Sequence, residues 1–253
     1  MALVETWRNG AVAGIRMNRP DRANALSAEL VEALLTAINE AIDSGARILV
    51  LSGNGATFCG GFDLSTLEQE NDASLMYRFL RIELLLQALY YAPLYTVALV
   101  HGAVSGAGAD LAAACSRRIA APRSSLRFPG IRFGAVLGTR RLMALVGAKA
   151  RAILLEQERV DAEEALRINL IDRIAQQDEW DAIVESLECS IAAVPTESAS
   201  QVMQLDIAHG DRDLGLLARS IAEPGLKQRM QEYWLAMKAE RAERLPREGI
   251  VGS

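Results

Sequence analysis

Two stretches of the chain share one design: residues 48–64, ILVLSGNGATFCGGFDL, and residues 95–111, YTVALVHGAVSGAGADL. Each begins with an apolar run typical of a buried strand and continues into a glycine-rich loop. Glycine lets a ligand approach the backbone closely, and a helix that starts after such a loop offers unpaired N–H groups. Two such loops side by side can stabilise an oxyanion. Taken singly, each loop is better explained as a tight turn between a strand and a helix.

The rest of the chain alternates between strand and helix patterns. Asn9-Gly10 lies between two apolar segments and predicts a hairpin. Ser27 is a candidate N-cap for a helix with one apolar face, and residues 74–92 predict a long helix that ends before Pro93. After Gly138 the chain is mostly helical. This order predicts a mixed α/β core followed by a helical C-terminal region.

Composition excludes several classes of function. The chain has 253 residues, 51% of them hydrophobic, and a net charge of −5 without a basic stripe, so we expect no nucleic-acid partner. Its apolar runs are interrupted by Pro93, His101 or charges, so we expect no membrane span. The three cysteines form no C-x-x-C pair, which argues against a disulfide framework or a zinc site. With no signal peptide in the N-terminal residues, we expect a cytoplasmic protein.

Common catalytic motifs are missing from the sequence. There is no G-x-S-x-G, no G-x-G-x-x-G and no Walker sequence, and two histidines, His101 and His209, cannot form H-E-x-x-H. We therefore expect no metal ion in the site. The available chemistry comes from backbone dipoles, carboxylates, hydroxyls, tyrosines and arginines.

Three motifs together resemble the enoyl-CoA hydratase/isomerase (crotonase) superfamily. They are residues 18–26 (NRPDRANAL), residues 58–64 (FCGGFDL) and the loop at 100–111, and the similarity in order and spacing covers roughly residues 3–240. The resemblance implies a crotonase-like spiral of strand-strand-helix (ββα) units. It also implies an acyl-CoA thioester as substrate and no separate cofactor, because CoA is part of the substrate.

The same resemblance implies an assembly. Members usually form homotrimers, often paired as a dimer of trimers, with C-terminal helices at the subunit contacts. We therefore expect a crotonase-like core at 1–195, a helical oligomerisation region at 196–245 and a flexible tail at 246–253. The apolar stripes of residues 214–221 and 230–237 are compatible with that role.

Site residues follow from the resemblance position by position. It implies that the backbone N–H groups of Phe62 and Ala107 hold the thioester oxygen, with Ala107 standing where glycine is usual. Arg22 stands where a basic residue often meets a CoA phosphate, although a solvated surface arginine is an equal alternative. The CoA moiety is expected along a short strip of backbone formed by Phe62, Asp63, Leu64 and Ser65.

The acid/base residues depart from a hydratase. The resemblance implies that the first acid/base residue lies three residues after the second oxyanion donor, which is Asp110 here, on the same helix face as Ala107; the alternative is a helix-start aspartate that satisfies N–H groups. Gly130, a substrate-binding position, replaces the second catalytic Glu. Isomerase, decarboxylase or thioester-cleaving chemistry is therefore favoured over hydration. The alternative is a non-catalytic acyl-CoA binder or assembly subunit.

Five further side chains are explained more simply by a structural role than by contact with a ligand. Arg132, next to Gly130, could pair with a substrate carboxylate, but an ordinary surface arginine is the simpler interpretation. Tyr77, Tyr90 and Tyr91 fall on the predicted long helix, where helical packing explains them more simply than contact with a ligand. A structural role is likewise expected for His101, which precedes a turn glycine.

Overall fold

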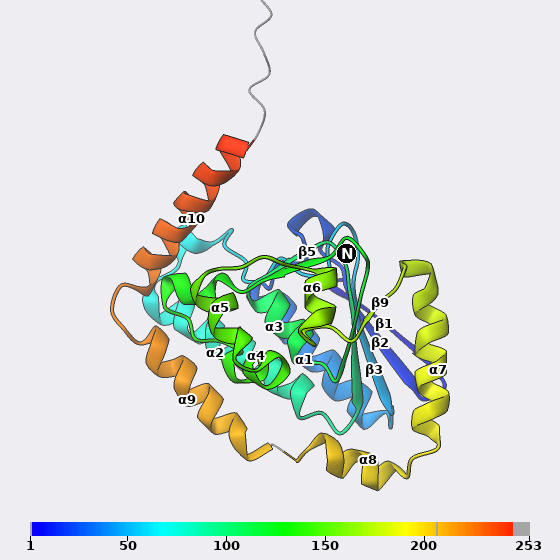
Figure 1. Ribbon diagram of the computed structural model, residues 1–253. Helices are drawn as coiled ribbons and strands as arrows, with labels where there is room; N and C mark the ends of the chain where they lie inside the picture. Colours follow the sequence, from blue (N-terminus) through cyan, green and yellow to red (C-terminus); the bar gives the residue numbers. More distant parts are fainter. Residues whose placement is uncertain (1, 206, 245–253) are drawn as a thin grey trace, which may run out of the picture.

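The computed structural model describes residues 2–205 and 207–244 (Figure 1). It opens with the expected hairpin of β1 (Val4–Asn9) and β2 (Val12–Met17). Asn9 pairs with Val12, so the turn is formed by Gly10 and Ala11, one residue later than the Asn-Gly pair suggested. Gly10 has φ +55°, a conformation that glycine adopts without steric cost.

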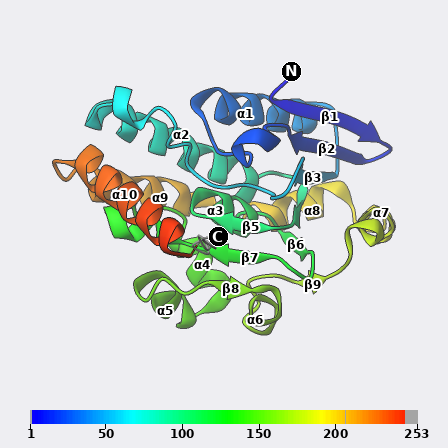
Figure 2. The same cartoon turned by 90° about the horizontal axis from the view of Figure 1, so that it is seen from above.

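Two sheets form the framework, and Figure 2 shows them from above. The larger has the strand order β1-β2-β3-β4-β6-β9. From β2 onward, neighbouring strands of this sheet are parallel. The strands after β2 are β3 (Ile48–Gly53), β4 (Tyr95–Val100), β6 (Arg117–Ala120) and β9 (Arg173–Ile174). The smaller sheet joins β5 (Ala103–Ser105), β7 (Ser125–Arg127) and β8 (Val160–Asp161). Because β3 and β4 are parallel neighbours, the loops that follow them leave the same sheet edge.

Three helices pack around these loops. Ser27 caps α1 (Ala28–Asp43) by accepting a hydrogen bond from the Leu30 N–H, as predicted. Asn71 and Ser74 form a capping box at the start of α2 (Asp72–Tyr90). Every residue of the short helix α3 (Ala107–Ala113) is buried. The first turn of α3 therefore presents its N–H groups inside the molecule rather than to water.

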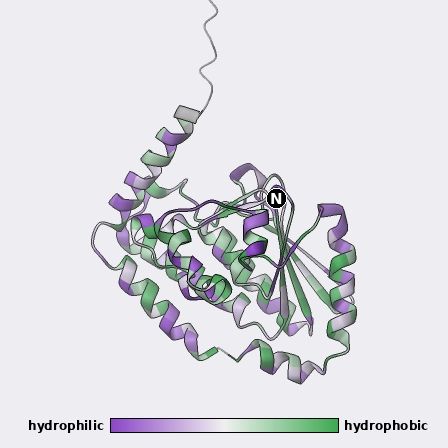
Figure 3. Cartoon of the chain, in the orientation of Figure 1, coloured by the Kyte–Doolittle hydropathy of each residue, from purple (hydrophilic) through white to green (hydrophobic). Residues whose placement is uncertain are grey.

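A 3₁₀ turn at Pro129–Phe133 follows β7, and the remaining helices come after this turn. They are α4 (Thr139–Val146), α5 (Lys149–Leu155), α6 (Ala162–Arg167), α7 (Trp180–Ala192), α8 (Thr196–Met203), α9 (Gly210–Ile221) and α10 (Leu226–Arg244). Figure 3 shows largely hydrophobic strands, whereas α9 and α10 carry residues of both kinds. Among the described residues, no helix is long and apolar enough to cross a membrane.

The C-terminal helices pack on the core of their own chain. Leu217 and Ile221 of α9, and Leu226 and Met230 of α10, are buried in the main hydrophobic cluster. Other apolar side chains around α8, including Val202 and Leu205, stay exposed. These leave room for the expected subunit contacts, which remain a prediction. The expected flexible tail at 246–253 lies outside the described residues.

Candidate active site

The two glycine-rich loops lie against each other, as the sequence suggested. The Phe58 N–H donates to the His101 carbonyl at 2.9 Å, and the Ser105 N–H donates to the Cys59 carbonyl at 3.4 Å. A Cβ atom added to Gly61 would lie 2.3 Å from the Ser105 carbonyl oxygen, too close for any side chain. Glycine is therefore required where the loops meet.

The N–H groups of Phe62 and Ala107 are both available at this junction. Leu26 forms a parallel β-bridge with Phe62: the Leu26 N–H donates to the Gly61 carbonyl, and the Asp63 N–H donates to the Leu26 carbonyl. Because the residues on either side of Phe62 make these bonds, the Phe62 N–H points away from Leu26. Ala107 is the first residue of α3, and neither N–H has a backbone acceptor among the described residues. Phe62 and Ala107 also line one pocket. Two N–H groups without a backbone acceptor thus belong to the lining of one pocket, and such a pair is suited to stabilise an oxyanion.

Two arginines, the buried Arg78 and the half-buried Arg19, hold the Phe62 loop in place. The Phe62 ring stacks on Phe79 at 4.6 Å between centroids, and the Arg78 guanidinium lies 4.1 Å from its centroid. Arg78 donates to the Asp63 carbonyl at 2.9 Å. Arg19 forms a 3.0 Å ion pair with the Asp63 carboxylate. These contacts fix the direction of the Phe62 N–H.

The Asp63 carboxylate is already engaged within the protein. Although burial opposes ionisation, hydrogen bonds from Ser65 and Arg19 lower the pKa of Asp63. Asp63 therefore shapes the loop, and its N–H and carbonyl are also paired within the protein, with Leu26 and Arg78. Its predicted contact with CoA remains a prediction.

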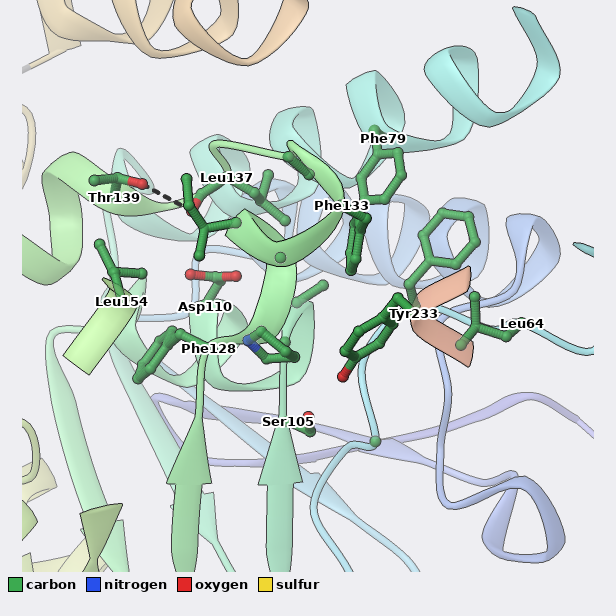
Figure 4. A pocket seen from close by; sticks show the side chains of 18 of the residues that line it. Leu64, Phe79, Ser105, Asp110, Phe128, Phe133, Leu137, Thr139, Leu154 and Tyr233 are labelled. Atoms are coloured by element: carbon green, nitrogen blue, oxygen red, sulfur yellow. Dashed lines mark hydrogen bonds between the residues drawn. The ribbon is translucent and has the colours of Figure 1, made fainter. Parts of the chain in front are cut away.

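The pocket is narrow and mostly apolar, with a volume of about 80 Å³. Figure 4 shows that it extends from Leu64 and Tyr233 to Asp110 and Leu154. Helix α10 of the same chain covers it through Tyr233 and Met237. The other apolar side chains in its lining are Phe79, Phe128, Ile131, Phe133, Ala135 and Leu137.

Asp110 lies inside this pocket, one helical turn beyond Ala107. Its residue is 6% exposed, and its carboxyl group has no hydrogen-bond partner among the described residues. Burial raises the pKa of Asp110 well above the ordinary value, with Arg141 opposing and Glu83 adding to the shift. A Cβ atom on Gly138 would lie 2.1 Å from Asp110 Oδ1, so the carboxyl group rests directly on the backbone there. A buried carboxyl with a raised pKa is suited to acid/base work.

A buried ion-pair network lies behind Asp110. Arg141, 1% exposed, donates to Glu83 at 2.5 Å and to Asp213 at 3.2 Å. Arg140 also pairs with Asp213, at 2.8 Å. Two cations are thus matched by two carboxylates without Asp110. The network leaves no spare positive charge to stabilise an ionised Asp110, consistent with the direction of its pKa shift.

The other predicted positions divide between pocket and surface. Gly130 lines the pocket, so the place of the second carboxylate holds no side chain. Arg22 and Ser65 line a surface groove that also includes Lys238. Leu64 belongs to both the groove and the pocket. The strip from Phe62 to Ser65 thus connects the pocket to the groove.

The remaining candidates do not line the pocket. Arg132 points toward α10, 4.0 Å from Glu240, and Tyr77 is 62% exposed. Tyr90 and Tyr91 pack edge to face. His101 is buried and its Nε2 lies 3.1 Å from the Gly55 carbonyl, in agreement with a structural role.

Comparison with known sequences decides the family. A family model described as enoyl-CoA hydratase/isomerase matches residues 7–211. The chain belongs to this family. The enoyl-CoA hydratase/isomerase family acts on acyl-CoA thioesters, and the expected family and fold class are confirmed.

Relatives and solved structures agree with this assignment. The chain is 37% identical over 203 residues to a probable enoyl-CoA hydratase, echA6, of Mycobacterium tuberculosis, covering 78% of this chain and 80% of the relative. A putative enoyl-CoA hydratase/isomerase from Bordetella parapertussis has a TM-score of 0.90 and 39% identity, covering 92% and 99% of the two chains. A monofunctional enoyl CoA isomerase from M. smegmatis has a TM-score of 0.69 and 25% identity, covering 83% and 94%.

Proposed function

We propose that this protein is an isomerase that moves the double bond of an enoyl-CoA thioester, with Asp110 as the group that carries the proton. One observation carries the proposal: Asp110 is the one carboxyl group in the lining of the pocket, within the described part of the chain. It lies on α3 three residues after Ala107, whose N–H faces the same space. A single base beside an oxyanion site suffices to move one proton from one carbon to another.

The proposed reaction begins with ionised Asp110. Its carboxylate removes a proton from C2 of a 3-enoyl thioester, and the C–H electron pair passes into the thioester as a dienolate. The Phe62 and Ala107 N–H groups hold the negative oxygen. The protonated Asp110 then gives a proton to C4, which leaves the double bond between C2 and C3. No atom is gained or lost, and Asp110 is ionised again at the end.

The other reactions fit the pocket less well. Hydration needs a water molecule held between two acid/base groups, and Gly130 supplies none. A decarboxylase would place a substrate carboxylate near Asp110 in a pocket without a lining cation among the described residues, which is costly. Thioester cleavage needs water in a mostly apolar space. The fold is shared with the M. smegmatis enoyl CoA isomerase and with hydratases alike, so the choice rests on the pocket lining.

We propose further that CoA is the only cofactor-like group involved and enters as part of the substrate. Its pantetheine would follow the backbone strip of Phe62, Asp63, Leu64 and Ser65, and Arg22 would meet a phosphate. The surface groove at Ser65 and Arg22 supports this path. We also propose a homotrimer or a dimer of trimers, which light scattering would test; a monomer would contradict it.

The deciding experiment is exchange of the C2 protons of an acyl-CoA with deuterium from the solvent, followed by mass spectrometry or NMR. We expect exchange with the natural chain and at least a hundredfold loss in Asp110→Ala. Exchange unchanged in Asp110→Ala would show that Asp110 is not the base.

A second variant tests the oxyanion site. Ala107→Pro removes one donor N–H at a first helical position, where proline is tolerated. We expect it to lose exchange as well. Tight acyl-CoA binding without exchange or isomerisation by the natural chain would favour the alternative function, a non-catalytic acyl-CoA binder.

A further inference from the structure

The far end of the pocket lies close to the oxyanion site. From Ala107 to Asp110, α3 advances by three residues, or about 4.5 Å. Figure 4 shows Leu154, Phe128 and Thr139 around Asp110, at the end opposite Leu64. An acyl chain whose carbonyl oxygen meets the Ala107 N–H therefore passes Asp110 after a few carbons and then meets Leu154.

The small volume of the pocket agrees with a short acyl chain. About 80 Å³ is available. The sulfur, oxygen and carbonyl carbon of the thioester share this space with the acyl chain.

The walls also restrict the charge of the acyl group. Phe128, Leu137 and Leu154 are apolar, and no Lys, Arg or His lines the pocket within the described residues. A carboxylate at the end of the acyl chain would be buried without a cation and close to Asp110. Burial of an unpaired charge is strongly unfavourable.

We infer that the substrate carries a short, uncharged, straight acyl group, and that Leu154 sets the upper limit of its length. This inference rests on the proposed function for the position of the thioester. Leu154 is half-buried near the end of α5, between the buried Ile153 and Leu155, which is 71% exposed. Leu155 therefore offers a matched control: the same residue type, next in the chain, outside the pocket lining.

The test measures binding of saturated acyl-CoAs of four to twelve carbons by calorimetry, so that no turnover is required. For the natural chain we expect the tightest binding at four to six carbons and at least tenfold weaker binding at ten. Leu154→Ala removes three carbon atoms from the end wall and should bind decanoyl-CoA at least tenfold more tightly than the natural chain does. Leu155→Ala should keep the natural profile.

Two further ligands and one variant sharpen the result. Leu154→Phe should weaken hexanoyl-CoA more than butanoyl-CoA, and succinyl-CoA should bind at least tenfold more weakly than butanoyl-CoA. Affinity of the natural chain that rises steadily to twelve carbons would overturn the inference. So would an equal shift in Leu155→Ala. The proposed isomerase is tested separately by proton exchange, so loss of either conclusion leaves the other measurable.

Discussion

Replacing Asp110 with asparagine should stabilise the protein while it removes proton transfer. The asparagine side chain has nearly the shape of a protonated aspartic acid. In the natural chain, burial raises the pKa of Asp110 well above its ordinary value. When the pKa of a carboxyl group is higher in the folded than in the unfolded protein, its contribution to the stability of the folded state is full at pH values below the unfolded pKa. That contribution is lost as the pH rises through the folded pKa. Asparagine has no proton to lose and avoids this loss.

The size of the effect follows from the linkage between protons and folding. Between the unfolded pKa of about 3.9 and the folded pKa, the natural chain loses about 1.4 kcal/mol of unfolding free energy per pH unit through this one group. For a chain of 253 residues, that corresponds to a change in melting temperature of roughly 3–6 °C per pH unit. The difference between Asp110→Asn and the natural chain should therefore grow with pH and become constant above the folded pKa.

The assay is thermal unfolding of both proteins at matched pH values, followed by circular dichroism. Asp21→Asn is the control, because the Asp21 side chain is 80% exposed and stays in water after folding. Its difference from the natural chain, measured at the same pH values, is the background against which the Asp110→Asn difference is compared. If the difference for Asp110→Asn is the same at every pH, Asp110 takes up no proton on folding, and the argument from burial fails.

Three other predictions concern Asp110 itself, the buried Arg141 and the loop glycine Gly61. The kcat/KM for isomerisation should rise with pH through the raised pKa of Asp110, because the reaction begins with the carboxylate; a profile that falls over this range would contradict that order of steps. Arg141→Met should cost about 3–5 kcal/mol in urea unfolding because it leaves buried carboxylates unpaired, whereas Arg81→Met, which breaks a more exposed pair, should cost less than about 1 kcal/mol. Gly61→Ala should cost about 1–3 kcal/mol or more in the same assay, since Gly61 has φ +92°, and should weaken acyl-CoA binding more than Gly60→Ala does.

Much of the fold could be predicted from local patterns. Asn9-Gly10 indicated the hairpin, Ser27 the start of α1, and the apolar runs the parallel strands β3 and β4. These signals are short-range, because turn chemistry, capping and strand burial depend on neighbouring residues. The hairpin turn differed by one residue because pairing of β1 with β2 fixes its register.

The two loops were predictable because glycine spacing marks them in the sequence. The family resemblance selected Phe62, Ala107 and Asp110, and the structure brings all three into the lining of one pocket; their roles stay a prediction. The pocket walls were not found, because Tyr233 and Leu154 come from distant helices and are brought in only by tertiary packing.

The buried arginines were missed for a different reason, although a signal was present. Arg78 lies among Leu75, Phe79 and Ile82 on the apolar face of α2, where a charge is rarely placed without a partner. Such a residue predicts a buried ion pair or hydrogen-bond cluster. The two partners of Arg78, the Glu70 carboxylate and the Asp63 carbonyl, could not be identified from the sequence.

In the proposed reaction, Asp110 and the two N–H groups act on the same negative charge. Before proton transfer the charge lies on the Asp110 carboxylate, where burial and the balanced pairs around Arg141 disfavour it. After transfer it lies on the thioester oxygen, where the Phe62 and Ala107 N–H groups face it. The total charge of the pocket is the same in both states. The surroundings of Asp110 that make the carboxylate unfavourable therefore favour the enolate, and the two parts of the site need each other to drive the step.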